Sequence, residues 1–346
     1  GQVNYYRTIQ TAEGPQDTEV RGLSFFGQDE FSLARWTFNL GLRGEQWTHY
    51  ATTGKSVHAF DWTLAPRLSA VLDIAGDGTK KISAYWGRYY DPIRVDITNY
   101  AGTLTGQVRE EQVFANNQWV TYRTRGGAVT QNGFFSETVK TPYTDELQLQ
   151  YEEDLGGGMS AGATYYRRQT RDIFEDFDPT VYTVPSAYGD VNAPNSLFLG
   201  WDYFGWTAAD HPVANFYLGT LKGGERNYNG LELALRKRFS DRWQALFSYN
   251  YLDGKGNALS DGNNDSAGDL LWLDPRAPDI YGAIPGTIHH VLKTAGSYTT
   301  GYGLELGGTY RWNSGTIANQ TQLDAGYRIP AQVAPSAAYL YGGAVE

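Results

Sequence analysis

Cysteine is absent from the 346 residues, and methionine occurs only once. The lack of cysteine excludes disulfide bridges and thiolate metal sites. No apolar run approaches the roughly 18 residues that a membrane-spanning helix needs. The sequence opens with neither a methionine nor the charged and apolar stretches of a signal peptide, so we expect a mature or internal piece of a protein.

Positive charge is scarce too, because 28 Lys and Arg stand against 38 Asp and Glu, for a formal net charge of -10. Phosphate backbones repel an acidic chain, and we therefore expect no nucleic-acid partner. The mean hydropathy of -0.48 is that of a water-soluble protein. It is uninformative for a membrane β-barrel, in which only alternate strand residues face lipid and the loops are polar.

Glycine, with 41 residues, and aromatic side chains, at 15%, are abundant. Many of them lie in alternating segments such as 36–47, WTFNLGLRGEQW. One face of this strand would hold Trp36, Phe38, Leu40 and Leu42, and the other Arg43 and Glu45. In a membrane barrel the apolar face meets lipid and the polar face lines a wet lumen, and we expect that orientation here.

About ten such segments follow one another along the chain. We predict strands at 20–31, 36–47, 60–74, 80–91, 146–153, 159–172, 231–239, 243–252, 288–299 and 304–313. Strands of soluble proteins are usually about 5–6 residues long, whereas a tilted membrane strand needs about 9–11. The lengths therefore favour an all-β fold, a transmembrane antiparallel β-barrel.

Short turns and long connections alternate between these segments. The turns stand at 34–35, 75–78, 156–158, 240–242 and 300–302, and the long connections cover about 91–142, 173–227 and 253–287. Outer-membrane barrels alternate in this way, with short periplasmic turns and long extracellular loops. Aromatic clusters near strand ends fit the girdles at the two bilayer interfaces. The alternative, a soluble all-β domain, gives no reason for the alternation.

Several motifs occur in a fixed order along the chain. They are FGQDE at 26–30, WTFNLGLRGE at 36–45, APRL at 65–68, GDGTK at 76–80, GRYYDPI at 87–93, TPYTDE at 141–146, TRDIFEDFD at 170–178 and YNGLEL at 228–233. Their order and spacing resemble the barrel of TonB-dependent outer-membrane receptors, in particular the Oar-like branch. The resemblance covers about residues 20–315.

This resemblance implies a 22-stranded barrel in the outer membrane of a Gram-negative bacterium. It also implies an N-terminal plug, a TonB box and a carboxypeptidase-regulatory-like β-sandwich before the plug. None of these three occurs in the sequence, and the family's final aromatic residue is replaced by the ending GGAVE. We therefore expect residues 1–346 to be a single domain, a segment of a larger receptor barrel that lacks the final strands.

The function implied by the resemblance is uptake of a nutrient or signal, either a small ligand or a peptide. The loops would capture it, and the TonB-ExbB-ExbD system would pull on the plug to open a path. The alternative is an outer-membrane barrel for surface structure, adhesion or assembly with other surface proteins, without transport. In both cases lipopolysaccharide and other outer-membrane lipids would surround the barrel.

The motifs do not support an enzyme. GMSAG at 158–162 matches G-x-S-x-G, but a nucleophile elbow requires a strand–turn–helix, and this match lies on a glycine-rich turn before an alternating strand. None of the five histidines has the H-E-x-x-H spacing of a zinc site. We expect no catalytic residues, and calcium is the one cofactor to consider.

An acidic loop matches the start of a calcium-binding loop. Oxygen ligands at positions 1, 3, 5 and 9 of that pattern are supplied by Asp261, Asn263, Asp265 and Asp269. Position 6 is Ser266 in place of glycine, and position 12 is Trp272 in place of glutamate, so the sharp turn and the bidentate ligand are missing. A weak calcium site is one interpretation, and a solvated Asp/Asn loop is the one we favour.

The stretch WDYFGW at 201–206 places four aromatic side chains in one long connection: Trp201, Tyr203, Phe204 and Trp206. Surface loops seldom carry such a group without burying it. One interpretation is that these side chains bind a ligand at its entrance. The other is that they pack beneath the loop and hold it folded.

Overall fold

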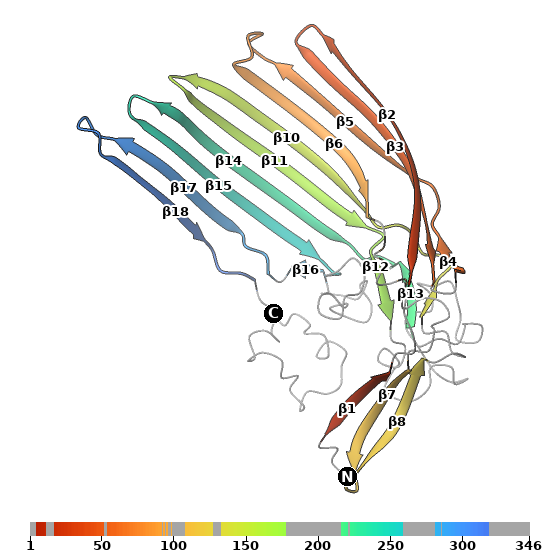
Figure 1. Cartoon of the computed structure of the whole chain (residues 1–346). Helices are drawn as coiled ribbons and strands as arrows, with labels where there is room; N and C mark the ends of the chain where they lie inside the picture. The colour runs from red at the N-terminus through yellow and green to blue at the C-terminus, as the bar shows by residue number, and fades with distance from the viewer. Residues whose placement is uncertain are drawn as a thin grey trace.

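The computed structural model describes residues 5–11, 17–51, 54–91, 93, 95, 98, 108–126, 133–177, 216–220, 222–258, 281–284 and 286–317. Strands dominate this part of the chain, and no helix within it is long and apolar enough to span a membrane. The largest element is a 12-stranded sheet, and two three-stranded sheets lie beyond one end of it (Figure 1).

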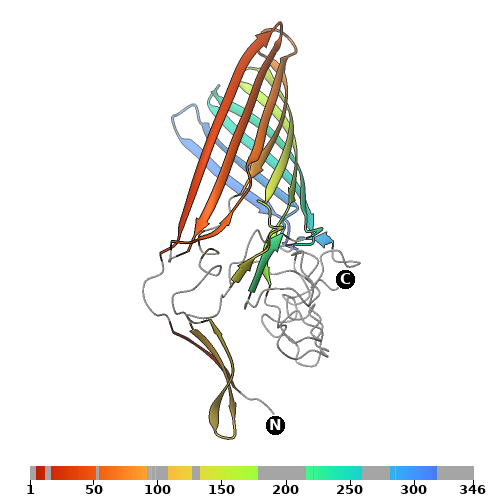
Figure 2. The same cartoon turned by 90° about the vertical axis from the view of Figure 1, so that its right-hand side faces the viewer.

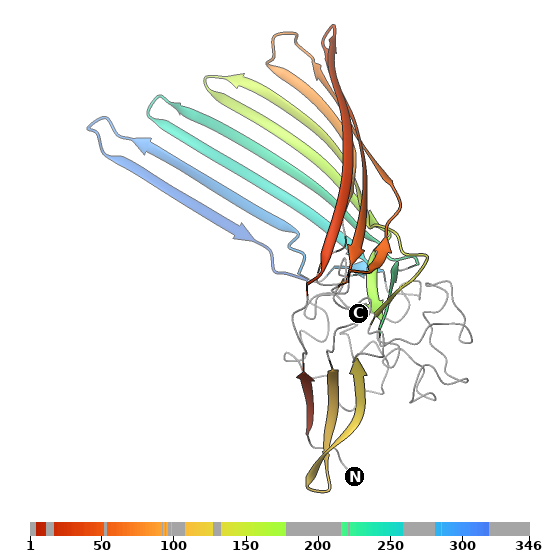
Figure 3. The ribbon, with the colours of Figure 1, turned by 45° about the vertical axis from the view of Figure 1, so that its right-hand side comes forward.

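Ten long strands form the path of the large sheet, each antiparallel to the next along the chain. They are β2 (Glu19–Leu33), β3 (Trp36–Tyr50), β5 (Thr63–Asp73), β6 (Lys80–Tyr90), β10 (Tyr143–Gly156), β11 (Met159–Arg171), β14 (Arg226–Ser240), β15 (Trp243–Gly256), β17 (His290–Thr299) and β18 (Glu305–Asn313). Two short strands flank this path: β4 (Ser56–Ala59) pairs with β3, and β16 (Gly282–Ala283) pairs with β15. The sheet curves like part of a barrel wall, with β2 and β18 at its two open ends (Figures 2 and 3).

One row of residues across the sheet shows which face is apolar. The register sets side by side Leu33, Trp36, Leu72, Ile82, Tyr151, Ala163, Leu233, Tyr249, Leu292 and Trp312. Directly opposite residues of antiparallel strands share a face, so this face is apolar across all ten strands. The next row lies on the other face and is mostly polar: Ser32, Thr37, Val71, Ser83, Gln150, Thr164, Glu232, Asn250, Val291 and Asn313.

The expected membrane barrel wall is therefore confirmed, with an apolar outer face and a polar inner face. In β3 the outer face holds Trp36, Phe38, Leu40 and Leu42, as predicted. The inner face holds Arg43 and Glu45, which form an ion pair of 2.7 Å between Nε and Oε2.

The register also gives the tilt of the strands. In β3 the apolar row passes through Trp36, the first residue of the strand. In β18 it passes through Trp312, seven residues beyond Glu305, the first residue of that strand. Eight steps between strands separate these two positions. At about 3.3 Å per residue and about 4.8 Å between strands, the strands tilt by roughly 30° from the barrel axis. Outer-membrane barrels have a similar tilt, roughly 35–45°.

Two ion pairs bound the apolar band on the outer face of β6 and β10. Lys80 and Glu153 pair at 2.8 Å near the short turns, and Arg88 and Asp145 pair at 2.7 Å near the other end. The rows between them carry apolar and aromatic side chains: Ile82 with Tyr151, Ala84 with Leu149, and Trp86 with Leu147. The eight steps along the strand from Lys80 to Arg88 span about 26 Å, which matches an apolar band about 25 Å tall.

The short turns all lie at one end of the sheet, at the top of Figure 1. The turn from β5 to β6 is held by the Asp73 carboxylate, which accepts hydrogen bonds of 2.8 Å from the N–H groups of Gly76 and Gly78. In the same turn the Thr79 hydroxyl and N–H donate to Asp77 and lower the pKa of that exposed carboxyl. By the rule for outer-membrane barrels, this end is periplasmic.

Some predicted strand ends were wrong. The segments expected at 60–74 and 288–299 begin later, at Thr63 and His290. Phe60 is only 3% exposed because it leaves the wall and packs in a separate hydrophobic core. The segment expected at 146–153 is longer, from Tyr143 to Gly156.

The long connections are not merely loops, because they contain strands that the sequence did not predict. One three-stranded sheet, which we call the arm, has the order β1 (Tyr6–Thr11), β7 (Val108–Ala115) and β8 (Gln118–Gly126). The other sheet has the order β12 (Phe174–Phe177), β13 (Phe216–Thr220) and β9 (Gly133–Phe135). Beside it lies a small core of Phe60, Ile93, Phe135, Val139, Phe174 and Leu218. We call this second sheet, its core and β4 the cap.

Candidate ligand-capture site at the extracellular rim

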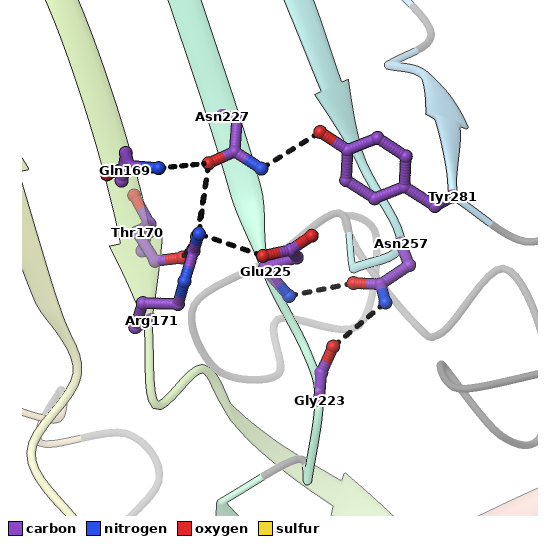
Figure 4. Close-up of polar contacts among 8 residues, drawn as sticks. All are labelled: Gln169, Thr170, Arg171, Gly223, Glu225, Asn227, Asn257 and Tyr281. Atoms are coloured by element: carbon purple, nitrogen blue, oxygen red, sulfur yellow. Dashed lines mark hydrogen bonds and ion pairs between the residues drawn. The ribbon is translucent and has the colours of Figure 1, made fainter.

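The end of the wall opposite the short turns is extracellular, and a polar network lies there at the ends of β11, β14 and β15 (Figure 4). The Arg171 guanidinium forms an ion pair with Glu225, with 2.8 Å between Nη2 and Oε2. Both of its terminal nitrogens also donate to Asn227 Oδ1 at 3.2 Å. A charged planar donor is thereby fixed between two neighbouring strands.

Asn227 links this ion pair to two further groups. Its Oδ1 also accepts a hydrogen bond of 3.2 Å from Gln169 Nε2, and its Nδ2 donates to the Tyr281 hydroxyl at 2.9 Å (Figure 4). Tyr281 precedes the short strand β16, so the network reaches from β11 to the segment beyond β15.

Asn257 fixes the backbone at the end of β15. Its Oδ1 accepts from the Glu225 N–H at 2.7 Å, and its Nδ2 donates to the Gly223 carbonyl at 2.9 Å. Asn257 is almost fully buried, so its side chain acts as an internal clamp on the chain that enters β14. The rim is therefore held in one shape before any ligand arrives, which reduces the ordering cost of binding.

The cap lies beside this rim, and two histidines lie where β4 of the cap pairs with β3 of the wall. His49, at the end of β3, is fully buried, and its Nδ1 atom lies 2.7 Å from the Thr98 hydroxyl. Its Nε2 atom has no hydrogen-bond partner within the described residues. His58 of β4 lies directly opposite His49 and stacks on Phe135, with 5.3 Å between ring centroids. Burial lowers the pKa of His58, and the nearby Asp61 partly opposes this.

The arm presents aromatic and cationic groups farther from the wall. The Arg7 guanidinium lies 4.2 Å from the Trp119 ring centroid, and Phe114 packs edge-on against the same indole at 5.3 Å. Tyr5 contacts Phe114 and is 64% exposed. Within the part of the chain that is described, β1 and β8 each have β7 as their strand partner and leave one edge open.

By register Gln169, Arg171 and Asn227 share the outer face of the wall with Ala163 and Leu233. The inner face carries polar groups of its own. Glu146 of β10 forms an ion pair with Arg168 of β11 and accepts from Gln148 at 2.8 Å. Arg67 of β5 lies over the Tyr89 ring, 4.8 Å from its centroid. A ligand that enters the lumen would therefore meet charged and hydrogen-bonding groups along the wall.

The residues singled out from the sequence lie outside the described residues. This applies to the aromatic group Trp201, Tyr203, Phe204 and Trp206, and to the acidic group Asp261, Asn263, Asp265 and Asp269. Elsewhere, within the ranges that the structure describes, no group of three or more His, Asp or Glu residues is placed to hold a metal ion. Ser160 of the G-x-S-x-G match lies in β11 after the Gly157–Gly158 turn and is paired with Asp154, as its alternating pattern indicated.

Sequence reasoning missed Arg171, Glu225, Asn257 and Tyr281. Each stands at the end of a strand or just beyond it, where alternation stops and gives no signal. Arg171 and Glu225 are more than 50 positions apart, and only the antiparallel pairing of β11 with β14 brings them together. The motif TRDIFEDFD contains Arg171, but nothing in it identifies the partner.

Comparison with known proteins shows which family and which structures this chain resembles. Residues 89–318 match the model of a family described as outer membrane beta barrel domain. The TonB-dependent transporter Oar of Myxococcus xanthus is 23% identical over 345 residues, covering 85% of this chain and 30% of that protein. The resemblance to Oar-like receptors is confirmed, and the chain spans less than a third of that relative's length.

Solved structures share the same wall. The FrpB iron transporter from Neisseria meningitidis (F3-3 variant) aligns with a TM-score of 0.53 at 12% identity, covering 90% of this chain and 36% of that one. The outer membrane transporter YddB from Escherichia coli aligns with a TM-score of 0.50 at 14% identity, covering 86% and 43%. At these identities the likeness establishes the fold alone.

Proposed function

The chain belongs to the outer membrane beta barrel domain family, and from that membership we propose that the whole protein takes up a ligand through the outer membrane of a Gram-negative bacterium. The long loops capture a nutrient or signal ligand, and a TonB-ExbB-ExbD system supplies the force through a plug. The relatives are transporters and receptors, and we propose that this protein, too, performs no catalysis.

The observation that carries the proposal is the rim network above a polar wall. Arg171, Asn227 and Tyr281 hold donors and acceptors in fixed positions at the extracellular edge of the wall, where Arg171 and Asn227 are on the outer face by register. The inner face below them is polar, with groups such as Glu146 and Arg168 along the route to the periplasm. A polar rim that is fixed before binding, together with a polar inner face, suits capture followed by passage.

Two expectations from the sequence remain proposals alongside this one. The aromatic group Trp201, Tyr203, Phe204 and Trp206 adds stacking surface for the ligand. The group Asp261, Asn263, Asp265 and Asp269 binds calcium weakly or remains a solvated loop. Lipopolysaccharide is the proposed neighbour of the outer face.

Adhesion or surface assembly is the second candidate, and the arm favours it. An open strand edge can pair with a strand of another protein, and β1 and β8 each present one. Exposed aromatic residues such as Tyr5, which directly precedes β1, are typical of contact surfaces.

The test compares four bacterial strains, with and without the full-length protein and with and without TonB. Each strain grows in a complex medium whose components are followed by mass spectrometry. We expect at least one compound to disappear only when the protein and TonB are both present. Equal depletion without TonB, or without the protein, contradicts uptake and leaves adhesion as the better reading.

Two matched variants separate the rim from the wall. Asn257→Ala removes the clamp on Glu225 and Gly223, and we expect depletion of that compound to slow by about tenfold, the effect of roughly 1.4 kcal/mol. Asn229→Ala removes an amide on the outer face, which accepts from Tyr165 at 3.1 Å, and should leave depletion unchanged. If the compound is depleted at the same rate by both variants, the rim has no part in its uptake.

A further inference from the structure

A groove lies on the inner face of the wall near its periplasmic end, far from the rim. Its floor includes the small residues Ala295 and Ser297 of β17 and Gly307 and Thr309 of β18. Gln244 and Leu246 of β15 lie between these residues and β14. Arg236 and Arg238 of β14 form one side of it. All of these positions share the inner face by register, because Arg236, Leu246, Ala295 and Thr309 form one row.

Two more cations continue the groove. Lys293 of β17 and Arg311 of β18 are directly opposite each other, two residues beyond Ala295 and Thr309 on the same face. Like charges placed directly opposite on neighbouring strands repel and destabilise the sheet. On β14, Arg238 lies two residues from Arg236 on the same face, so two positive charges are close together there as well.

The four cations have no ion pair and no side-chain hydrogen bond within the described part of the chain. The inner-face carboxylates nearest to Arg236 are Asp154 and Glu152 of β10, two strands away, and Glu232, four residues along β14. Glu305 of β18 lies on the same face, two residues from Gly307. Asp154 Oδ1 already accepts a hydrogen bond of 2.8 Å from the Gly156 N–H. By contrast, Arg43 and Arg168 on the same wall are paired with carboxylates.

The length of these side chains limits the size of an anion that all four cations could contact. Strands about 4.8 Å apart put the backbone of Arg236 about 12 Å from that of Lys293, and the inward curvature of the wall makes the long side chains converge. The charged ends can therefore lie on either side of a group a few ångströms wide. The small residues of β17 and β18 leave room for it beside Leu246, and Thr309 adds a hydroxyl donor. The Ser297 hydroxyl accepts a hydrogen bond of 3.0 Å from Gln244 and can still donate its own hydrogen.

We propose that this groove binds a small polyvalent anion, a phosphate or carboxylate compound that passes through the lumen. Two guanidinium groups from β14 hold one end of the anion, and the Lys293–Arg311 pair holds the other. Arginine binds planar oxyanions through two parallel hydrogen bonds, which suits both classes. The inference rests on the proposed uptake function only in that a transported ligand is the source of the anion.

Inorganic pyrophosphate serves as the probe, titrated calorimetrically into the purified full-length protein in detergent at low salt. We expect saturable binding by the wild type, at least tenfold weaker in Arg236→Gln/Arg238→Gln and in Lys293→Gln/Arg311→Gln. Arg67→Gln, which removes an inner-face cation on β5, should bind like the wild type. The proposal is overturned if the wild type does not bind pyrophosphate, which would be the result if an acidic polypeptide segment already occupied the groove. Equal binding by all variants would overturn it as well.

A thermal-stability measurement tests the site independently of any loss of folding. Without pyrophosphate, Arg311→Gln should melt higher than the wild type because it relieves the repulsion with Lys293. With pyrophosphate, the wild type should gain more in melting temperature than this variant, and the opposite order contradicts the site. Neither measurement needs TonB. A failure of uptake in cells would therefore not contradict pyrophosphate binding, and a failure to bind pyrophosphate would not contradict uptake.

Discussion

Aromatic rings lie over glycines of the neighbouring strand at several points of the wall. Tyr166 of β11 covers Gly230 of β14, and Tyr228 of β14 covers Gly254 of β15. A Cβ atom at either glycine would overlap the ring. Glycine weakens a strand by its freedom and its missing side chain, and a ring laid over it restores packing and shields the backbone. This pairing gives a physical reason for the abundance of both residue types.

The first prediction follows from this packing. Gly230→Val should displace the Tyr166 ring and destabilise the barrel by about 1–3 kcal/mol, the usual cost of overpacking. Gly27→Val on β2 is the control, because nothing lies within 4 Å of a Cβ atom there. Urea unfolding of the full-length protein in lipid vesicles measures both, and an equal change in the two variants would disprove the role of the ring.

The second prediction concerns pH and the cap. His58 has a pKa lowered by burial, so the unfolded cap takes up a proton before the folded one does. The cap should therefore be unaffected above the ordinary histidine pKa of about 6.5 and should lose stability as the pH falls below it. The groups that face His58 are His49, the rings of Phe60 and Phe135, and Asp61.

Hydrogen exchange of the backbone around β4 at pH 7.5 and pH 5 measures this loss in the full-length protein. His58→Phe keeps a ring against Phe135 but cannot titrate, and its exchange should rise less on acidification. If wild type and variant respond equally to pH, the sensitivity lies elsewhere.

At the scale of the strand, alternation was sufficient to predict the ten long strands and the face that each residue occupies. It succeeded because one solvent, lipid, contacts every second residue over about ten positions, as the row from Leu33 to Trp312 shows. It failed where that constraint ends. β7, β8 and β9 lie in a connection whose pairing depends on distant partners, such as β13 for β9 and β1 for β7.

The candidate site shows the same limit. Arg171 is visible in the sequence, but Glu225 and Asn257 become partners only through the register of β11, β14 and β15. The sequence instead drew attention to residue clusters in long connections, whose roles remain predictions. Local sequence patterns therefore predicted the strands of the wall but not the contacts between residues at the strand ends.

The third prediction tests the faces of β14. Leu233 lies on the outer face between Ala163 and Tyr249, with no charged neighbour in its row. Leu233→Arg should cost about 2–4 kcal/mol, the range for an arginine facing lipid near the midplane. Ala234→Arg, one residue along and on the inner face between Gly162 and Ser248, should cost far less. Similar unfolding free energies for the two variants in vesicles would reverse the assignment of the faces.

The whole sheet raises the question of closure. β2 and β18 are the two ends of its path and do not pair with each other. Unpaired backbone groups in lipid cost several kcal/mol each, so an open sheet cannot stand alone in a membrane. Asp29 of β2 adds to the argument: it lies on the outer face opposite Leu40, where an unpaired carboxylate is costly unless a further strand supplies a partner.

The last prediction follows from these open edges. Strands outside this sequence, or another chain, should stand between β2 and β18 in the complete barrel. Residues 1–346 contain no cysteine, so a pair introduced there meets no other cysteine within this segment. Ser24→Cys on β2 with Thr309→Cys on β18 should not react together with a short thiol cross-linker in cells that make the full-length protein. Asn39→Cys with Ser69→Cys is the control, since these residues are directly opposite on β3 and β5 and should cross-link readily. Placing the β2 cysteine at Gly22, Phe26 or Gln28 covers other registers of the same edge. Efficient cross-linking of any of these positions to residue 309 would mean that ten strands close on themselves, and the barrel would then need no further strands.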